Sequence, residues 1–436
     1  MKQWPPVPKP IFDTLENIAH PPDCVIHYLN SLPLTPAKQE FAHCTEFLKS
    51  YARSKDTFSA YRREVERLLH WSWLICKKPL KEVNRNDIRD YLQFAQAPLK
   101  SWMATKIVDR FINNADGVRV QNPDWRPFVA KISKNARRQG KMPNKAQYQL
   151  SNKSIEAIFA VLSSMFTYLQ QEEYLEINPV SLIRQKKNYI QRQQTRKVTR
   201  KLSAVQWLFV INTAETMAKN NHQHERTFFL MSAFYLLGLR ISELAYSKER
   251  MATMGNFAPD KRGLWWYTTI GKGNKLRDVA VPDELLASLK RYRETLDLSP
   301  LPRRDEPTPL FPKLKGKEGL GARQIRNIVQ IVFDSAIETL RSAGKLDEAE
   351  DLATATVHWL RHTAISSDVE FRPREHVRDD VGHENPATMD KYIDIDRVAR
   401  HRSAQSKQLK PTAGKSRDKI DKIKKLKVKA KEKEFA

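Results

Sequence analysis

Cysteine and long hydrophobic runs are both scarce in this sequence. Its 436 residues include three cysteines, Cys24, Cys44 and Cys76, an odd number without C-x-x-C spacing. This pattern excludes a disulfide framework and a zinc ribbon, which need paired or closely spaced cysteines. The most apolar stretch, residues 228–239, is shorter than the roughly 18 apolar residues that a transmembrane helix needs. The sequence therefore predicts no transmembrane helix.

A secretory signal is also missing. The first residues, MKQWPPVPKPIFD, contain no apolar core ahead of a small-residue cleavage site. Unpaired cysteines fit the reducing environment of the cytosol. We therefore expect a cytoplasmic protein, associated with the nucleoid if its partner is DNA.

Negative charge is in short supply. The chain carries 76 lysines and arginines against 50 aspartates and glutamates, which gives a formal net charge of +26. Contact with a polyanion releases counterions, so a surplus of this size predicts a partner of dense negative charge. Charge favours nucleic acid, although an anionic membrane surface or the ribosome would also fit. The hydrophobic fraction of 40% is sufficient for packed cores and excludes a globally disordered chain.

Composition and periodicity divide the chain into five segments. Proline clusters near the N-terminus predict an irregular leader. Apolar residues at helical spacing over 59–74, 84–94 and 151–176 predict an all-helical domain behind it. The segments are a proline-rich leader over 1–37, a helical domain over 38–183, a basic linker over 184–202, a mixed α/β domain over 203–405 and a lysine-rich tail over 406–436.

The β signal lies in the second half of the chain. Two β-rich runs, residues 263–270 and 276–281, flank GKGNK at 271–275, whose glycines and asparagine supply the turn chemistry of a hairpin. Before this hairpin, Ser203 caps a predicted helix, and residues 226–237 form a largely buried one. The expected fold class is therefore mainly α with a small β-sheet.

Two charged pairs are candidates for chemistry. Arg240 follows Gly238-Leu239 at the end of the buried helix, and Glu243 lies three residues on, within reach on one helical face. His358 and Arg361, in the motif HWLRH, have the same spacing. Taken singly, each pair has an ordinary structural interpretation as neighbours on a helix surface.

The order of the motifs is more specific than any one of them. LGLRISEL, the GKGNK hairpin and HWLRH are followed by VGH, which ends at His383, and by KYI, which contains Tyr392. Taken alone, Tyr392 would be interpreted as an ordinary tyrosine of the hydrophobic core. In this order, the sequence resembles the tyrosine recombinase (phage integrase) family, whose pattern is Arg, Lys, His-x-x-Arg, His or Trp, and Tyr. All six positions are filled.

The resemblance covers residues 203–405 as the catalytic domain. More weakly, residues 38–183 resemble the family's helical, SAM-like core-binding domain, so the resemblance implies the two-domain tyrosine-recombinase architecture. The interval between the hairpin and His358 is long and includes a charged stretch at 341–351, which predicts an insertion. The catalytic residues that the resemblance implies are Arg240, Lys272, His358, Arg361, His383 and Tyr392.

The activity that the resemblance implies is site-specific recombination. Such an enzyme cuts and rejoins double-stranded DNA through a covalent 3′-phosphotyrosyl intermediate, in the integration or excision of a mobile element. Because this intermediate keeps the energy of the phosphodiester, no ATP is expected, nor any metal or other cofactor. The implied partners are double-stranded DNA recombination sites, further copies of the chain in a tetramer on DNA, and accessory DNA-bending or directionality proteins, with no membrane.

The residue types suit this chemistry on their own. Arg240 and Arg361 are permanently charged forks that match two phosphoryl oxygens, and two such cations can replace a metal ion. His358 can accept the phenolic proton or donate to the phosphate. His383 can donate a hydrogen bond.

Tyr392 and Lys272 are expected to act on the bond that forms and the bond that breaks. Tyr392 is the predicted nucleophile, which becomes linked to the 3′ phosphate. Lys272, on the hairpin turn, is the predicted general acid for the 5′ oxygen, with Lys275 as the alternative.

Three other functions compete with this one. A type IB topoisomerase also uses a tyrosine, but acts as a monomer on one duplex; the hairpin and the LGLRISEL motif favour the recombinase. A catalytically silent DNA-binding protein would be expected to lose some of the six groups, and none is missing. A metal-dependent transposase or nuclease needs carboxylate clusters for two divalent ions, and the sequence contains no convincing one.

Overall fold

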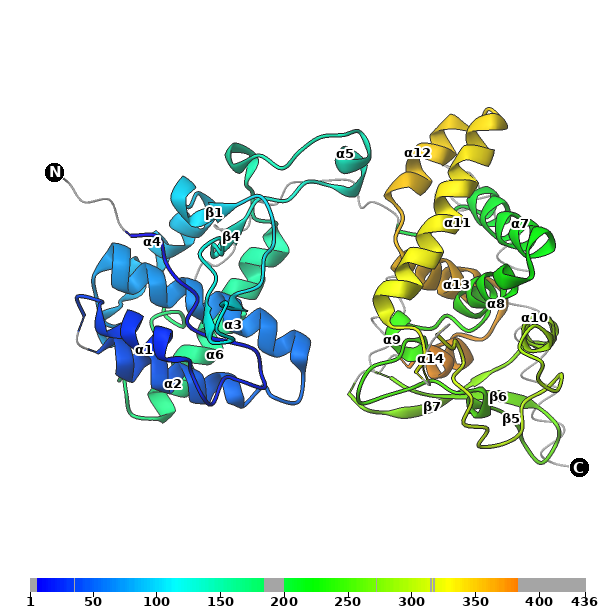
Figure 1. Ribbon diagram of the computed structural model, residues 1–436, viewed down its shortest axis with the longest axis horizontal. Coiled ribbons are helices and arrows are strands. Elements are labelled where there is room, and N and C mark those ends of the chain that lie inside the picture. Colours follow the sequence, from blue (N-terminus) through cyan, green and yellow to red (C-terminus); the bar gives the residue numbers. More distant parts are fainter. Residues whose placement is uncertain are drawn as a thin grey trace, which may run out of the picture. The chain divides into compact units, whose positions relative to one another are not determined.

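The computed structural model describes residues 6–34, 36–183, 200–271, 273–313, 316 and 318–382. It divides into two compact units, residues 1–196 and 197–436 (Figure 1). The predicted linker lies outside the described residues apart from 200–202, and the predicted tail lies wholly outside them. Within the described ranges, no helix combines the length and the apolar character that crossing a membrane requires.

Helices form the body of the first unit. Side-chain caps fix where three of them begin, because Ser54, Asn84 and Ser151 accept backbone N–H bonds from the first helical turn. The helices are α1 Asp23–Asn30, α2 Ala37–Lys49, α3 Lys55–Trp71, α4 Arg85–Gln96 and α6 Asn152–Gln171. α3 packs against both α2 and α6, and their apolar faces share one core. The three helices predicted in this region are confirmed.

The proline-rich leader is not irregular throughout, and that prediction is wrong for its later part. Residues 23–30 form α1, and Ile11 and Phe12 are buried in the helical core. The backbone N–H of Ile11 donates to the buried Glu66 carboxylate at 2.8 Å. The prolines keep this stretch extended and reduce the number of N–H groups that need partners. The apolar side chains between them provide the burial that holds it in place.

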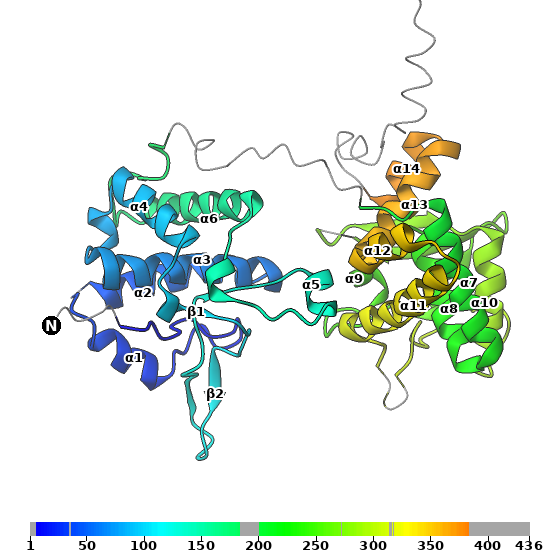
Figure 2. The same cartoon turned by 90° about the horizontal axis from the view of Figure 1, so that it is seen from above.

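The prediction of an all-helical first domain is wrong between α4 and α6. Here Asn114 makes a tight turn, because its side-chain oxygen accepts the N–H groups of Asp116 and Val118 at 3.0 and 2.8 Å. Figure 2 shows the resulting β2–β3 hairpin projecting from the helical body. The strands form two small sheets: β1 Met103–Ala104 parallel to β4 Phe128–Val129, and β2 Phe111–Asn113 antiparallel to β3 Arg119–Gln121.

The second unit is built around α8, which packs against α7, α10 and α13. α7 begins with the predicted cap, since Ser203 accepts the Gln206 N–H and the Gln206 side chain accepts the Ser203 N–H. The helices are α7 Ala204–Asn220, α8 Glu225–Leu236, α9 Ile241–Leu244, α10 Asp283–Glu294, α11 Ala322–Ser342, α12 Leu346–Thr354, α13 Val357–Phe371 and α14 Arg374–Val381. The stretch at 341–351, predicted to belong to an insertion, falls at the end of α11 and in α12.

One antiparallel sheet completes this unit. Its strands are β5 Phe257–Pro259, β6 Trp265–Ile270 and β7 Leu276–Ala280, in the order β5-β6-β7. The predicted hairpin is confirmed, with Ile270 opposite Leu276 and with Gly273 and Asn274 at positive φ in the turn. The described residues are thus mainly helical with small sheets, which confirms the predicted fold class.

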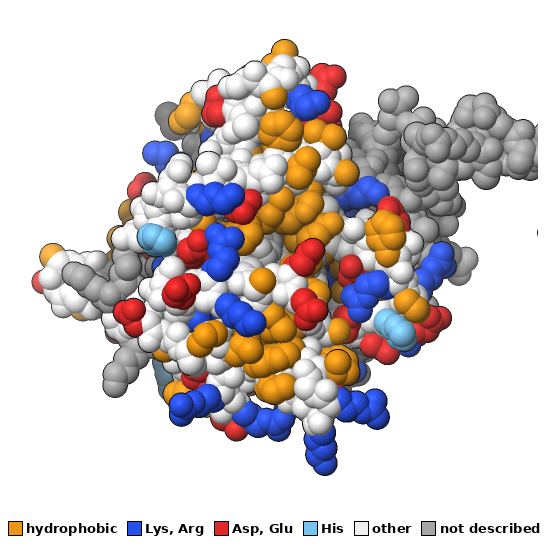
Figure 3. All heavy atoms as spheres, turned by 90° about the vertical axis from the view of Figure 1, so that its right-hand side faces the viewer, with side chains coloured by type: hydrophobic (Ala, Val, Ile, Leu, Met, Phe, Trp, Pro, Cys, Tyr) orange, Lys and Arg blue, Asp and Glu red, His pale blue; other side chains and the backbone are white. Residues whose placement is uncertain are grey.

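An apolar groove lies between α7, α8 and α10. Trp207 stacks on Tyr235 with ring centroids 4.1 Å apart, and Ile211 and Phe228 line the same groove of about 410 Å³. Figure 3 views the side of the second unit that carries α7 and α10, and apolar side chains form a stripe across it. This surface is open in the single chain.

Candidate active site

Three of the six predicted site residues lie in the described part of the chain, and the second unit brings them together. Arg240 is the residue before α9, while His358 and Arg361 lie on α13. Arg361 donates to the carbonyl of Gly238, two residues before Arg240, and the charges of both arginines lower the pKa of His358. The other three lie outside the described residues: Lys272, His383 and Tyr392.

Arg240 lies where the chain turns from α8 into α9. Gly238 ends α8 with a φ of +57°, a conformation that glycine adopts readily. The Arg240 N–H then donates to Glu243 Oε2 at 2.8 Å, and its Nη1 donates to Oε1 at 3.0 Å. The Arg240 side chain is still 27% exposed. Its guanidinium is therefore oriented by the protein on one side and open to a ligand on another.

Arg361 belongs to the core of the unit. It is 2% exposed, and it donates from Nη1 to the carbonyl of Gly238 and from Nη2 to the carbonyl of Val381, the latter at 2.9 Å. Gly238 lies two residues before Arg240, and Val381 ends α14. Arg361 thus ties the turn that carries Arg240 to the end of α14.

His358 is paired with a second histidine on α13. The rings of His358 and His362 meet edge to face, with centroids 4.4 Å apart. Partial burial of the ring lowers the pKa of His358, and the charges of Arg361 and Arg240 lower it further. Burial, His358 and Arg361 lower the pKa of His362 to about 4. A lowered pKa favours the neutral form of His358 near pH 7, in which the ring can accept a proton. The sequence prediction missed His362, although its i, i+4 spacing from His358 was visible.

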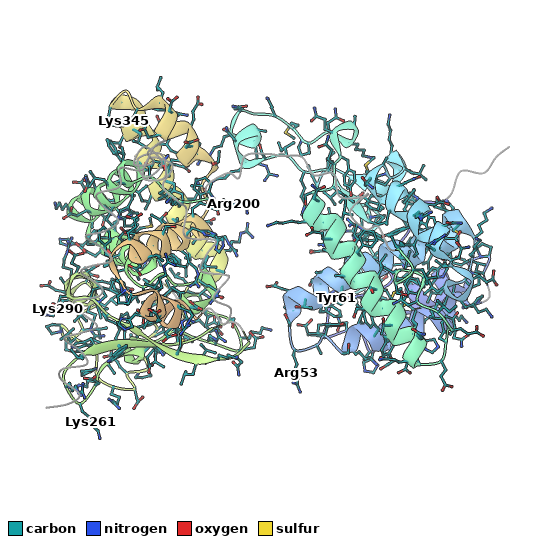
Figure 4. All side chains as sticks on the ribbon, turned by 180° about the vertical axis from the view of Figure 1, so that it is seen from behind. Arg53, Tyr61, Arg200, Lys261, Lys290 and Lys345 are labelled. Atoms are coloured by element: carbon teal, nitrogen blue, oxygen red, sulfur yellow. The ribbon has the colours of Figure 1, made fainter. Side chains whose placement is uncertain are left out.

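A further arginine lies at the start of the described part of the second unit. The charge of Arg200 contributes to the lowered pKa values of His358 and His362. Two residues later, the Leu202 N–H donates to Thr363 Oγ1 at 2.9 Å and docks this segment on α13. Figure 4 labels Arg200 on the second unit, on the opposite side from Lys290. The end of the predicted linker thus adds positive charge beside the histidines.

Glu243 and Arg277 form the closest ion pair of the site. Arg277, on β7, donates from Nη1 to Oε1 and from Nη2 to Oε2 of Glu243, both at 2.9 Å. Burial alone raises the pKa of Glu243, but the bonds and the charge of Arg277, with the Arg240 N–H, outweigh it and leave the pKa below its ordinary value. Glu243 is thus an anion held under guanidinium groups. The sequence prediction missed Arg277.

The hairpin turn lies beside this pair, because a Cβ atom at Gly271 would lie 2.7 Å from Arg277 Nη1 and 3.7 Å from Glu243 Oε1. The N–H of Gly271 donates to the Lys275 carbonyl at 2.7 Å, which closes the turn. Lys275 is described and exposed, whereas Lys272 lies outside the described residues. The two lysines therefore remain alternatives for the general acid.

Fixed positive charge dominates the described part of this site. Arg240 and Arg277 both bond to a single carboxylate, Glu243, and among the described residues no three His, Cys, Asp or Glu side chains come together as metal ligands would. Two guanidinium groups with separate supports can hold two oxygens of one tetrahedral anion. The arrangement suits a phosphate diester.

The first unit has a basic surface of its own. An arm over residues 131–145 contains no acidic residue, and it carries α5 (Lys134–Arg138) away from the helical body in both Figures 1 and 2. At its base, Lys131 lines a cavity of about 860 Å³ together with Arg62, Arg63 and Lys153. The cations of the arm are Lys131, Lys134, Arg137, Arg138, Lys141 and Lys145. This surface fits a polyanion.

The chain was compared with protein-family models, with curated proteins and with solved structures. No family model matches the chain. The chain is similar to the tyrosine recombinase XerC of Thermodesulfovibrio yellowstonii, with 26% identity over 250 residues, which cover 56% of this chain and 72% of that relative. It is also similar to the structure of the XerH site-specific recombinase bound to a palindromic difH substrate, a post-cleavage complex. That match has 15% identity and a TM-score of 0.52, and covers 92% of this chain and 99% of the other.

The XerH structure shares the fold with this chain, and XerC shares part of its sequence. The arginine, hairpin, His-x-x-Arg, histidine and tyrosine motifs occur here in the family's order. The chain is thus similar to tyrosine recombinases in part of its sequence, in its fold and in the order of its motifs.

Proposed function

We propose that this protein is a site-specific recombinase that cuts and rejoins double-stranded DNA through a covalent 3′-phosphotyrosyl intermediate. The observation that carries the proposal is the meeting of Arg240, His358 and Arg361 at one place in the second unit. Recombination is also the activity named for the relatives XerC and XerH. We assign residues 203–405 as the catalytic domain and residues 38–183 as the core-binding domain.

The reaction is a transesterification in which each bond broken is replaced. Tyr392 Oη attacks the scissile phosphorus, its proton passes to the neutral His358, and the bond from phosphorus to the 5′ oxygen breaks. Lys272, or Lys275, supplies the proton that the 5′ oxygen takes up. Religation runs the same steps in reverse, so no external energy source is consumed.

The arginines stabilise the transition state. Arg240 and Arg361 are oriented before substrate arrives, the first by Glu243 and the second by backbone carbonyls. Preorganised donors of this kind act on charge as it develops, without reorganisation during the reaction. His383 adds a hydrogen bond to the phosphate. These groups provide the positive charge that divalent ions provide in other nucleases, so the proposal includes no metal.

The DNA surface extends beyond the active site. The basic arm over 131–145 and the cavity at its base would contact the phosphate backbone, and so would the basic segment over 184–202. Such contacts position the protein on a duplex and give its affinity a strong dependence on salt. We place the protein in the cytoplasm, at the nucleoid, because its substrate is DNA.

Self-association on DNA is part of the proposal. Recombination joins two duplexes and needs four cutting subunits, so we propose a tetramer, with accessory DNA-bending or directionality proteins as further partners. The apolar groove between α7, α8 and α10 would receive a second copy of the chain, because open apolar grooves of this kind are typical of protein contacts. Integration or excision of a mobile element is the proposed role.

The deciding experiment traps the covalent intermediate. A duplex is selected from a random-sequence pool by its affinity for the Tyr392→Phe variant, nicked near its centre, and incubated with the wild-type protein. A detergent-resistant adduct should form with the wild type and not with Tyr392→Phe, although both bind the duplex. An adduct of normal yield from the variant would contradict the assignment of Tyr392.

The same assay separates the competing functions. Relaxation of any supercoiled plasmid by a monomer, without preference for the selected duplex, would favour a type IB topoisomerase. Binding without any adduct would favour a silent DNA-binding protein.

A further inference from the structure

One buried carboxylate connects three parts of the second unit. Glu243 is 2% exposed, and its two oxygens accept four bonds, two from the Arg277 guanidinium and two from the side chain and N–H of Arg240. Arg277 also donates from Nε to the carbonyl of Asp380, near the end of α14, at 2.8 Å. β7, α9 and α14 therefore meet on one arginine side chain.

Close backbone approach encloses this arginine. A Cβ atom at Gly271 would lie 2.7 Å from Arg277 Nη1, and one at Gly382 would lie 3.1 Å from Arg277 Cδ. Gly382 also has a φ of +64°. Gly271 immediately precedes Lys272 in the chain, and Gly382 immediately precedes His383. The side chain of Arg277 is therefore packed against the backbone leading into two predicted site residues.

We propose that Arg277 is a positioning residue of the recombination reaction, which orients the Arg240 guanidinium through Glu243 and fixes where the β6–β7 hairpin meets the end of α14. The inference rests on the proposed function, because it concerns the same site. Arg277 is not a catalytic residue: its Nε, Nη1 and Nη2 groups all bond to protein, and its side chain is 10% exposed.

The physical reason is a competition for positive charge. Glu243 needs a cation, and without the fork of Arg277 the nearest one is Arg240. Arg240 would then turn its charge toward the carboxylate and away from the phosphate. Arg277 satisfies both oxygens at once, so Arg240 keeps its free donors for the substrate. Lysine in place of Arg277 retains the charge but cannot make two parallel bonds and a third to a carbonyl.

The first measurement is single-turnover cleavage of the nicked, selected duplex by Arg277→Lys. Cleavage of the bound complex should slow on the order of 10-fold to 100-fold, since small displacements of a catalytic group have effects of this size. The affinity for the duplex should change little. We therefore expect the substitution to lower the cleavage rate and to leave the affinity for DNA unchanged.

The chain offers a matched control in the same unit. Arg293, on α10, makes the corresponding bonds: Nη1 and Nη2 to Glu306 at 2.9 and 3.0 Å, and Nε to the Ser299 carbonyl at 2.7 Å. It makes one more, from Nη2 to Ser299 Oγ at 3.2 Å. Arg293→Lys therefore removes an equivalent buried fork away from the site. It should lower the melting temperature as Arg277→Lys does, yet leave the cleavage rate of bound DNA unchanged. Equal slowing by both variants, or by neither, would overturn the inference.

Two further measurements test the route through Arg240. In an Arg240→Ala background, Arg277→Lys should add less slowing than it causes in the wild type, because one of the groups that it positions is gone. Full additivity of the two effects would count against the route. By NMR in the absence of DNA, Arg277→Lys should raise the pKa of His358, because Arg240 turns away from the ring, whereas Arg293→Lys should not.

The NMR measurement also keeps the two proposals distinguishable. A wild-type protein that forms no adduct disproves the proposed function. The His358 titration then still tests whether Arg277 orients the Arg240 guanidinium. A wild-type adduct with normal cleavage by Arg277→Lys disproves only the role of Arg277.

Discussion

The two arginines that we propose as catalytic differ in what surrounds them. The Arg240 side chain is 27% exposed and bonds to one carboxylate. Arg361 is buried and donates to two backbone carbonyls that are far apart in the sequence, those of Gly238 and Val381. Removal of Arg240 takes away a charge near the surface. Removal of Arg361 leaves a cavity and two buried acceptors without donors, so the same substitution has different consequences at the two positions.

We expect Arg240→Ala to slow cleavage of bound DNA on the order of 10²-fold, as loss of a preorganised oxyanion donor does. Its melting temperature should change little. Arg361→Ala should also lose free energy of unfolding, roughly 1–3 kcal/mol for each carbonyl left without a partner. Thermal melts and single-turnover cleavage of the two variants test this, and equal melting temperatures would contradict it.

His358 should titrate below the ordinary histidine range. Its pKa is lowered by partial burial, then by Arg361 and Arg240, so protonation sets in only at lower pH. A step that needs neutral His358 should therefore keep its rate as pH falls to about 6.5, the ordinary histidine value, and slow below it. Arg240→Ala should raise the pKa of His358 in an NMR titration, whereas Arg240→Lys, which keeps the charge, should leave it nearly unchanged. Equal shifts in both variants would show that charge is not the cause.

At the scale of elements, local signals predicted most of what the structure contains. The β6–β7 hairpin was predicted because its turn sequence is specific, and α3, α4 and α6 because their apolar residues recur at helical spacing. α7 was predicted from its Ser203 cap, and α8 from its apolar run. The β1–β4 pair was not predicted, because strands of two residues show no alternation of apolar and polar residues and each strand's partner lies far along the chain. Arg277 was missed for a similar reason: its partner Glu243 is 34 residues away, and nothing in the strand sequence marks it.

The arm over 131–145 gives a prediction at this scale. Replacing its four exposed cations, Lys131, Arg137, Arg138 and Lys141, by Ala should flatten the log–log salt dependence of DNA affinity by roughly 3 to 4 units, about 0.9 for each lost phosphate contact. Preference between selected and random duplexes should persist, because phosphate contacts carry no sequence information.

A matched set in the second unit serves as the control for the arm. Lys261, Arg262, Lys290 and Lys345 are exposed, and Figure 4 shows Lys261 and Lys290 away from Arg200. Their replacement should leave the salt slope nearly unchanged. A similar slope change in both sets would mean that the arm acts only through net charge.

At the scale of the whole molecule, the sequence predicted the family, while the structure describes each unit by itself. Residues 184–199, which join them in the sequence, lie outside the described part. The same holds for Lys272, His383 and Tyr392, so half of the site rests on motif order. The described half confirms the expected pairing of Arg240 with Glu243, and it shows two supports that motif order could not: Arg277 and the carbonyls bound by Arg361.

We expect the complete enzyme to work without metal ions. Adduct formation on the nicked duplex should persist in excess EDTA, because arginine, histidine and lysine side chains supply the charge that metal ions provide elsewhere. The measurement compares adduct yield with EDTA and with added magnesium. A strict requirement for magnesium would favour a metal-dependent nuclease instead.

The burial of Arg361 also bears on how such a protein can change over generations. A copy of the gene released from selection for recombination can lose Arg240 and still fold, because that side chain lies partly in solvent. It cannot lose Arg361 as easily, because the loss disturbs the packing between α13, the turn after α8 and the end of α14. Descendants that only bind DNA should therefore keep this arginine after the surface groups have drifted. Its presence in a relative is evidence of fold, and Arg240 is the better marker of activity.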